Sequence, residues 1–186
     1  MARLDPVLAP YTSEVAARLE AMMPHGVPPI LLFRLFARNL PMAEAMGEWG
    51  AYELSKRCSL SMRDREIVID RTCARCGCEY EWGVHVAFYA ERVGFSDKQI
   101  TSLTHGSATD ECWSELRDRL LIAAVDELFE SAQISDDLWS RLSEALTDEQ
   151  ILDVLLMTGW YHGICFAANG THLPIEPGAP RFVDVA

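Results

Sequence analysis

Helix start signals recur along this chain, and no segment shows the strict alternation of apolar and polar residues that marks a half-buried β-strand. Ser61 suits the N-cap of a helix whose first turn carries the acidic Asp64. Thr147 and Gln150 have the spacing of a capping box, and Pro41 stands where proline fits the first helical turn. These signals predict an all-α fold.

Caps, prolines and glycines divide the chain into a series of predicted helices. They cover residues 13–23, 30–38, 41–55, 61–77, 78–93, a short helix from 96, and then 111–129, 135–146 and 147–168. No Gly- or Ser-rich linker interrupts the series, and 49% of residues are hydrophobic, which argues against disorder. We therefore expect one domain over residues 1–186, with a Pro-rich tail at 170–186 that frays or wraps a neighbouring subunit.

The charge of the chain restricts its partners. Its 28 acidic and 16 basic residues give a formal net charge of −12, which argues against nucleic acid and against an anionic membrane surface. The N-terminus lacks the long apolar core of a signal peptide, and no stretch approaches the roughly 20 apolar residues of a membrane-spanning helix. We expect a cytoplasmic location, where the six cysteines would be reduced at rest.

Three residue types that suit acid–base or thiol chemistry recur at helical spacing. Cys78, Glu81 and His85 are three and four residues apart, so they are predicted to share one helix face. A tight turn near Gly77 would fold the preceding helix back and bring Glu66 to the same face. A carboxylate beside an imidazole orients the ring and raises its pKa, which suits a proton shuttle. A solvated surface pair of Glu81 and His85 is the plainer alternative.

The region around these residues resembles the carboxymuconolactone decarboxylase and alkylhydroperoxidase D superfamily. The resemblance rests on the block Glu-Tyr-Glu-Trp-Gly-Val-His at 79–85, on the helix that precedes it, and on the Gly and the Ser-Asp helix start that follow at 94–97. It covers the core motif region 61–104. It implies a helical bundle of the alkylhydroperoxidase D-like type and a homo-oligomer such as a trimer or hexamer.

The two branches of this superfamily imply different chemistry for the same positions. The peroxidase branch has a Glu on the first helix and Cys-x-x-Cys-x-x-x-His on the second. Glu66, Cys78 and His85 match the Glu, the first Cys and the His, but the second Cys position holds Glu81. A glutamate there is typical of the decarboxylase branch. The candidate catalytic residues are therefore Glu66, Cys78, Glu81 and His85.

Further cysteines and aromatic residues extend the candidate site. Cys73 and Cys76 form a Cys-x-x-Cys pair upstream of the family position, and each is a candidate for resolving an oxidised Cys78. Helix-packing thiols are the alternative interpretation, and a zinc site of these three cysteines with His85 is a third. The predicted site holds no metal and needs no cofactor. The residues expected to line the pocket are Tyr80, Trp82, Trp160 and His162.

Three functions are open at this point. The first is cofactor-free acid–base chemistry on a small organic acid or lactone, as the decarboxylase branch implies, with Arg34, Arg38, Arg71 or Arg75 binding an acid group. The second is thiol peroxidation with Cys78 as the attacking thiol. The third is a non-catalytic oligomeric protein that binds a small ligand. The first two make the chain an enzyme with a small-molecule substrate.

Overall fold

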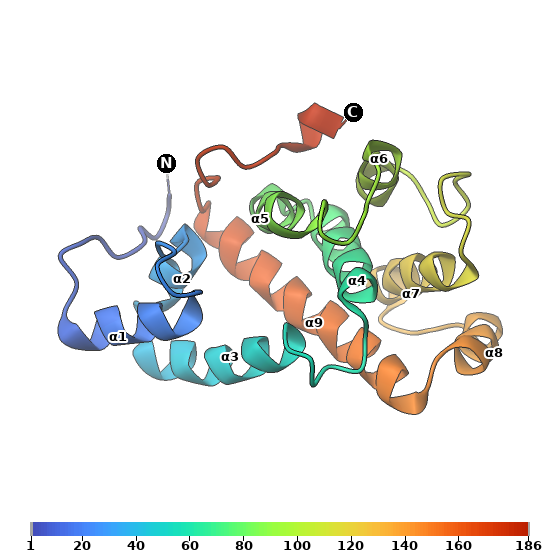
Figure 1. The fold of residues 1–186 in the computed structure, drawn as a ribbon, viewed down its shortest axis with the longest axis horizontal. Helices are drawn as coiled ribbons and strands as arrows, with labels where there is room; N and C mark the ends of the chain where they lie inside the picture. The colour runs from blue at the N-terminus through green and yellow to red at the C-terminus, as the bar shows by residue number, and fades with distance from the viewer. Residues whose placement is uncertain (1, 186) are drawn as a thin grey trace.

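The computed structural model describes residues 2–185, and every regular element in that range is helical (Figure 1). The α-helices are α1 (Ser13–Met22), α2 (Leu31–Phe36), α3 (Leu40–Glu53), α4 (Met62–Arg75), α5 (Glu79–Tyr89), α6 (Asp97–His105), α7 (Leu116–Ser131), α8 (Asp136–Ala145) and α9 (Asp148–Thr171), and a 3-10 helix η1 (Phe182–Val185) follows. The prediction of an all-α fold is confirmed.

Helix α4 lies at the centre of the fold, where it packs against α5, α6, α7 and α9 (Figure 1). It begins with a capping box, in which Ser61 accepts from the Asp64 N–H and the Asp64 carboxylate accepts from the Ser61 N–H. The consecutive residues 67–69 are all fully buried, because neighbouring helices cover α4 on several sides. Several polar side chains of α4, among them Glu66 and Asp70, are therefore buried in the interior.

Helix α9 is the longest element and crosses the molecule beside α4 (Figure 1). By length and composition alone it could span a membrane, contrary to the expectation that no stretch approaches this limit, but half of its most apolar window is buried inside the protein. Its outward side exposes Leu152, Leu156 and Phe166. Such a face suits a subunit contact, and the homo-oligomer stays a prediction.

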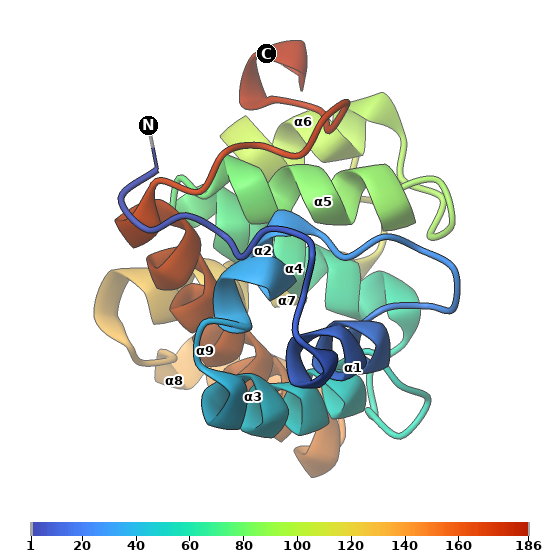
Figure 2. The same ribbon diagram turned by 90° about the vertical axis from the view of Figure 1, so that its left-hand side faces the viewer.

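Helices α1, α2 and α3 pack on one another and lie together at one end of the molecule (Figures 1 and 2). Two contacts fasten α3 to α9. The Tyr52 hydroxyl donates to Asp153 at 2.6 Å, and the rings of Trp49 and Trp160 lie 6.3 Å apart. This end of the molecule supplies most of the wall of the cavity described below.

The C-terminal segment crosses over α5 toward α6 (Figure 2). The Tyr80 hydroxyl donates to Glu176 at 2.6 Å and accepts from the Leu32 N–H at 2.9 Å. Gly83 allows the close approach, since a Cβ there would lie 2.7 Å from the Pro180 carbonyl oxygen. Instead of fraying or wrapping a neighbour, the predicted tail packs on its own chain.

Some helix boundaries differ from the predicted ones. The helix predicted over 111–129 begins only at Leu116, because Asp110 accepts hydrogen bonds from Ser102 and Ser107 and holds the preceding residues in a turn. Helix α5 ends at Tyr89, short of the predicted end at 93. These shifts leave the order of the helices unchanged.

Candidate active site

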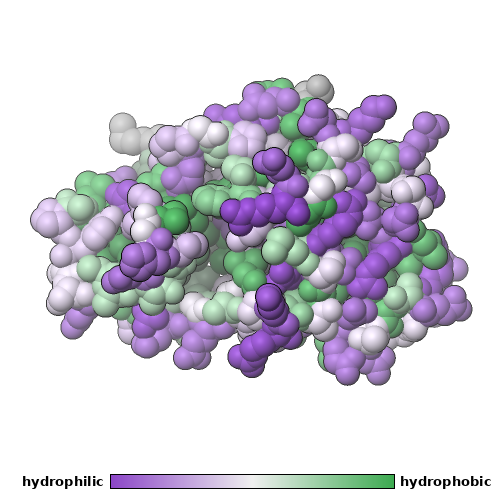
Figure 3. Space-filling view, in the orientation of Figure 1, coloured by the Kyte–Doolittle hydropathy of each residue, from purple (hydrophilic) through white to green (hydrophobic). Residues whose placement is uncertain are grey.

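A cavity of about 330 Å³ lies between the N-terminal helices and the helices α5 and α9. The surface is hollowed left of centre in the space-filling view, and hydrophobic residues surround the hollow (Figure 3). The volume falls in the range of small-molecule sites. The larger side chains of its wall are Met22, Met23, Ile30, Leu32, Phe33, Phe36, Met46, Leu54, Glu81, His85, Phe88, Tyr89, Trp160, Tyr161 and Ile164.

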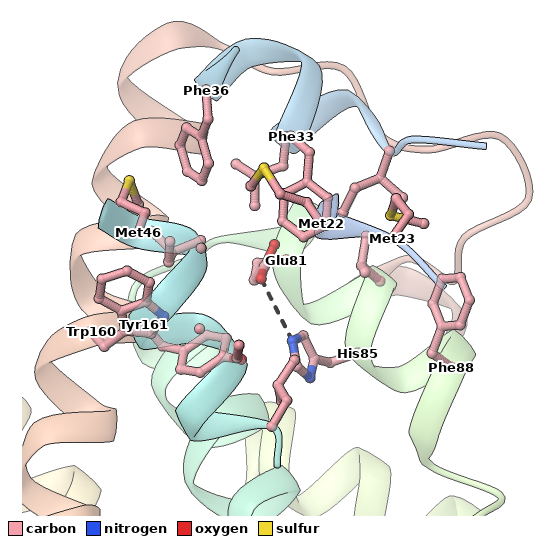
Figure 4. A pocket seen from close by; sticks show the side chains of 18 of the residues that line it. Met22, Met23, Phe33, Phe36, Met46, Glu81, His85, Phe88, Trp160 and Tyr161 are labelled. Carbon is pink, nitrogen blue, oxygen red and sulfur yellow. Dashed lines mark ion pairs between the residues drawn. The ribbon is translucent and has the colours of Figure 1, made fainter. Parts of the chain in front are cut away.

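Two ionisable groups, Glu81 and His85, face this apolar space from α5 (Figure 4). The Nδ1 of His85 lies 2.8 Å from Glu66 Oε2, and its Nε2 lies 3.6 Å from Glu81 Oε1. The imidazole thus lies between two carboxylates, that of Glu66 from α4 and that of Glu81 from α5. The proximity of Glu66 and His85 that the sequence predicts is present.

The local sequence explains how this group is assembled. Glu81 and His85 stand one turn apart on α5 and so share a face. Gly77, with φ of +58°, occupies the left-handed region that favours glycine and reverses the chain after α4. The reversal packs α5 against α4, so that Glu66, the fifth residue of α4, reaches the ring of His85.

The charges around the imidazole favour its protonated form. Burial would lower the pKa of His85, but the charge and hydrogen bond of Glu66, together with Glu81, raise the pKa well above its ordinary value of 6.5. Burial, and then the charge of Glu66, raise the pKa of Asp70 well above its usual range. These shifts favour the imidazolium form of His85 and the protonated form of Asp70.

One oxygen of the group has no partner. Glu81 is 5% exposed, and its Oε2 accepts no hydrogen bond from any described residue. Leaving a buried carboxylate oxygen unpaired is costly, and such atoms mark positions where a ligand or water binds. The ring of Tyr161 lies nearly perpendicular to the ring of His85, with 5.1 Å between the two centroids. This unpaired oxygen belongs to a residue that lines the cavity.

Several residues expected in the pocket lie elsewhere. Trp160 lines the cavity, but Tyr80 and Trp82 do not: Tyr80 holds Glu176, and Trp82 packs against Phe182 at 5.0 Å between ring centroids. His162 stacks on Phe129 at the other side of α9, with ring centroids 5.6 Å apart. Trp160, which lines the cavity, and His162 are two residues apart, about half a turn of α9, so they face opposite sides of the helix.

Cys78, which the spacing predicts to share a face with Glu81 and His85, does not line the cavity with them. It is the N-cap of α5, with a non-helical backbone at φ −93° and ψ 79°, so its direction does not follow the helical period. It is fully buried and is not among the residues that line the cavity. Tyr161, from α9, takes a place beside His85 instead.

The arginines expected to bind an acid group are engaged away from the cavity. Arg71 pairs with Asp126 at 2.7 Å, and Arg75 pairs with Glu130 at 2.9 Å. Arg34 and Arg38 donate to backbone carbonyl oxygens of the N-terminal segment. Within residues 2–185, the cavity wall contains no Arg or Lys. None of these four arginines therefore lines this cavity.

The zinc alternative also finds no support in the geometry. In the described part of the chain, no three His, Cys, Asp or Glu side chains are arranged to hold a metal ion. The ring nitrogens of His85 face Glu66 and Glu81 rather than the thiols. Cys73 contacts Cys165 of α9 instead, a partner that sequence spacing did not suggest.

Glu53, at the end of α3, gives the fold a pH dependence of its own. It is 1% exposed with its Oε2 unpartnered, and burial raises its pKa from 4.5 to about 7. A raised carboxyl pKa stabilises the fold at low pH, and this stability is lost as pH rises from about 4.5 through about 7. Glu53→Gln is therefore expected to raise the free energy of unfolding by about 2 kcal/mol at pH 8 and by little at pH 4.

Urea unfolding followed by tryptophan fluorescence at the two pH values measures this difference. Glu48→Gln, at an exposed position on the same helix, is the matched control and should change stability by less than about 0.5 kcal/mol. A loss of stability in the Glu53 variant at pH 8 would show that the carboxylate makes a favourable interaction there.

Comparison with known proteins agrees with the resemblance inferred from the motifs. The model of the carboxymuconolactone decarboxylase family matches residues 41–126. This match bears out the resemblance to the superfamily that the motifs indicate. No curated protein sequence matches the chain.

Three solved structures have the same fold. An uncharacterised peroxidase-related protein from Silicibacter sp. TM1040 is 17% identical with a TM-score of 0.82, over 97% of this chain and 95% of that one. A protein from Agrobacterium tumefaciens, named for AhpD-type antioxidant defence, is 21% identical with a TM-score of 0.66, over 75% and 94%. The debrominase Bmp8 with 2,3,4-tribromopyrrole is 11% identical with a TM-score of 0.74, over 94% and 91%. At these identities the likeness establishes the fold alone.

Proposed function

Because the model of the carboxymuconolactone decarboxylase family matches residues 41–126, we propose that this chain is a cofactor-free acid–base enzyme. Its substrate would be a small, uncharged and largely apolar molecule with an enolisable carbonyl group, such as a ketone or a lactone. The observation that carries the proposal is the unpaired Oε2 of Glu81, buried beside His85 in an apolar cavity.

The geometry supports a division of roles between the two residues. Glu81, as a carboxylate, removes a proton from the carbon next to the carbonyl group. The imidazolium of His85 donates its Nε2–H to the carbonyl oxygen, on which the enolate charge develops. Glu66 holds Nδ1 at 2.8 Å and keeps the ring charged and oriented. Returning the proton to the same or another carbon completes an exchange or an isomerisation.

The cavity wall supports an uncharged substrate over the organic acid that the family name suggests. The group of Glu66, Glu81 and His85 carries a net negative charge when both carboxylates are ionised, and no Arg or Lys in the described cavity wall offsets it. A dicarboxylate would enter against this charge and lose its hydration. The Bmp8 structure holds 2,3,4-tribromopyrrole, a small uncharged ring, and a ligand of this kind would suit an apolar cavity.

The cavity gives less support to thiol peroxidation by Cys78. An attacking thiolate must meet its peroxide, but Cys78 is fully buried and outside the residues that line the cavity. The acid–base hypothesis instead assigns the chemistry to Glu81 and His85, which line the cavity. It is therefore the function we favour for this site.

Hydrogen–deuterium exchange of candidate substrates tests the proposal. A panel of apolar ketones and lactones is incubated with the protein in D₂O, and loss of the signal of the proton next to the carbonyl group is followed by NMR. We expect at least one member to exchange about 100-fold faster than in buffer. Matched dicarboxylates should show no acceleration, and turnover of the dicarboxylates alone would overturn the assignment.

A further inference from the structure

A third polar side chain, that of Tyr161 from α9, lines the cavity together with Glu81 and His85 (Figure 4). Its ring makes an angle of 88° with the ring of His85, and the two centroids are 5.1 Å apart. The helices α5 and α9 thus bring three polar groups together in a cavity whose wall is otherwise mostly apolar. A few converging polar groups in an apolar pocket are typical of a site that orients a small molecule.

The hydroxyl of Tyr161 has no partner within residues 2–185. The residue is 4% exposed, and no hydrogen bond contributes to the environment of its hydroxyl. The hydroxyls of Tyr52 and Tyr80, by contrast, each donate to a carboxylate at 2.6 Å, as buried tyrosines usually do.

The position of the hydroxyl oxygen leaves room for a ligand. The fully enclosed side-chain atoms that lack a partner in the described chain include Glu81 Oε2 but not the Tyr161 oxygen. The Tyr161 oxygen therefore touches open space, and the space that Tyr161 lines is the cavity. A polar group in the cavity would supply the partner that the protein does not.

The surroundings of Tyr161 keep its hydroxyl protonated. Burial, and then the charges of Glu81 and Glu66, raise the pKa of Tyr161 well above its ordinary value of 10. At neutral pH the hydroxyl therefore acts as a hydrogen-bond donor. The influence of both carboxylates also means that the ring stands close to the groups of the proposed reaction.

We propose that the Tyr161 hydroxyl is a catalytic hydrogen-bond donor, which holds the carbonyl oxygen of the substrate together with His85. This inference rests on the proposed acid–base function and deepens it. When Glu81 takes the proton, the electron pair of the C–H bond forms a carbon–carbon double bond and the π pair of the carbonyl group moves to oxygen. The two donors stabilise this enolate oxygen, and Tyr161 keeps its own proton throughout.

Two donors on different helices restrict the class of substrate. A ketone or lactone carbonyl oxygen has two lone pairs and can accept from Tyr161 and His85 at once. A hydrocarbon offers no acceptor. A carboxylate would bring a second charged oxygen, for which the cavity wall has no Arg or Lys within the described residues.

The Tyr161→Phe variant tests the role in turnover, because it removes only the oxygen atom. In the D₂O exchange assay we expect kcat to fall by about 10²-fold, the usual effect of losing one donor to an oxyanion, while KM changes little. Tyr11→Phe carries the same chemical change outside the cavity wall and should behave as wild type. An unchanged kcat in Tyr161→Phe would overturn the assignment.

A binding experiment tests the same role without turnover. The Glu81→Gln protein resembles the state in which Glu81 has taken the proton, so a phenolate bound to it resembles the enolate. 4-Nitrophenol is the probe, and its absorbance follows the ionisation of the bound phenol during a pH titration. Adding Tyr161→Phe should move the ionisation about one pH unit higher, which is about a 10-fold loss of affinity for the phenolate.

The outcomes of the titration separate this inference from the proposed function. Absence of 4-nitrophenol binding, the same ionisation with and without the Tyr161 hydroxyl, or a shift caused by Tyr89→Phe instead would each overturn the inference. Loss of the cooperative urea transition in Tyr161→Phe would do so too, because the hydroxyl would then support the fold. If no ketone or lactone exchanged its proton in the wild type, the acid–base function would fail, and the titration would still decide whether Tyr161 donates.

Discussion

Replacing Glu81 by Gln is expected to lower the rate of catalysed proton exchange by about 10²–10⁴-fold, the usual contribution of a general base. The amide keeps the size of the side chain but cannot accept a proton from carbon at neutral pH. The wall of the cavity is otherwise unchanged, so the affinity for the substrate should fall by far less than the rate. The effect should therefore appear in kcat and leave KM nearly constant.

Exchange of the best substrate from the D₂O panel, measured over a range of substrate concentrations, separates the two constants. Glu91→Gln carries the same chemical change at an exposed position just after α5 and serves as the control. If Glu81→Gln raised KM and left kcat unchanged, Glu81 would bind the substrate without taking its proton. The role assigned to the unpaired oxygen would then be wrong.

The sequence carries strong signals for the elements that begin with side-chain caps. Ser61 and Thr147 cap α4 and α9 as predicted, and the order of the helices follows. A local signal could not show that residues 107–115 form a structured turn, because that turn depends on Asp110 accepting from Ser102, a residue on the previous helix. Its formation depends on tertiary contacts, which periodicity does not report.

The part of the candidate site that lies on a single helix could be predicted from the sequence. Glu81 and His85 are one turn apart, so their shared face follows from the spacing alone. Cys78, Tyr80 and Trp82 were also expected at the site but do not line the cavity, since Cys78 is the N-cap of α5 and the other two contact the C-terminal segment. The helical period predicts which side chains share a face of one helix. It does not predict which other part of the chain packs against that face.

The residues that form the wall of the cavity could not be predicted from the sequence. It comes largely from α1, α2 and α3, whose apolar residues read as ordinary core positions, and its apolar character disfavours an acid substrate. Cys165 was equally hidden, since its approach to Cys73 depends on how α9 crosses α4. Contacts between distant helices determine both features.

Removing the Glu66 side chain should have the largest effect on stability. Glu66 is 1% exposed, and its ion pair with the buried His85 measures 2.8 Å. Glu66→Ala is expected to lower the free energy of unfolding by about 3–5 kcal/mol at pH 6, because it leaves a buried imidazolium without its main partner. Glu44→Ala, which breaks the exposed pair with Arg18, is the control and should cost less than about 1 kcal/mol.

The pH dependence of this loss identifies its cause. In the wild type the pKa of His85 is raised on folding, so its protonation stabilises the fold fully below about pH 6.5 and progressively less as pH rises through the raised value. Without Glu66 that pKa should fall, and an NMR titration of the imidazole would show it. The stability difference between wild type and Glu66→Ala should accordingly be largest at pH 6 and smaller at pH 9 in urea unfolding. An equal difference at both pH values would mean that Glu66 stabilises the fold through packing, and the charged imidazolium required at the proposed site would lose its support.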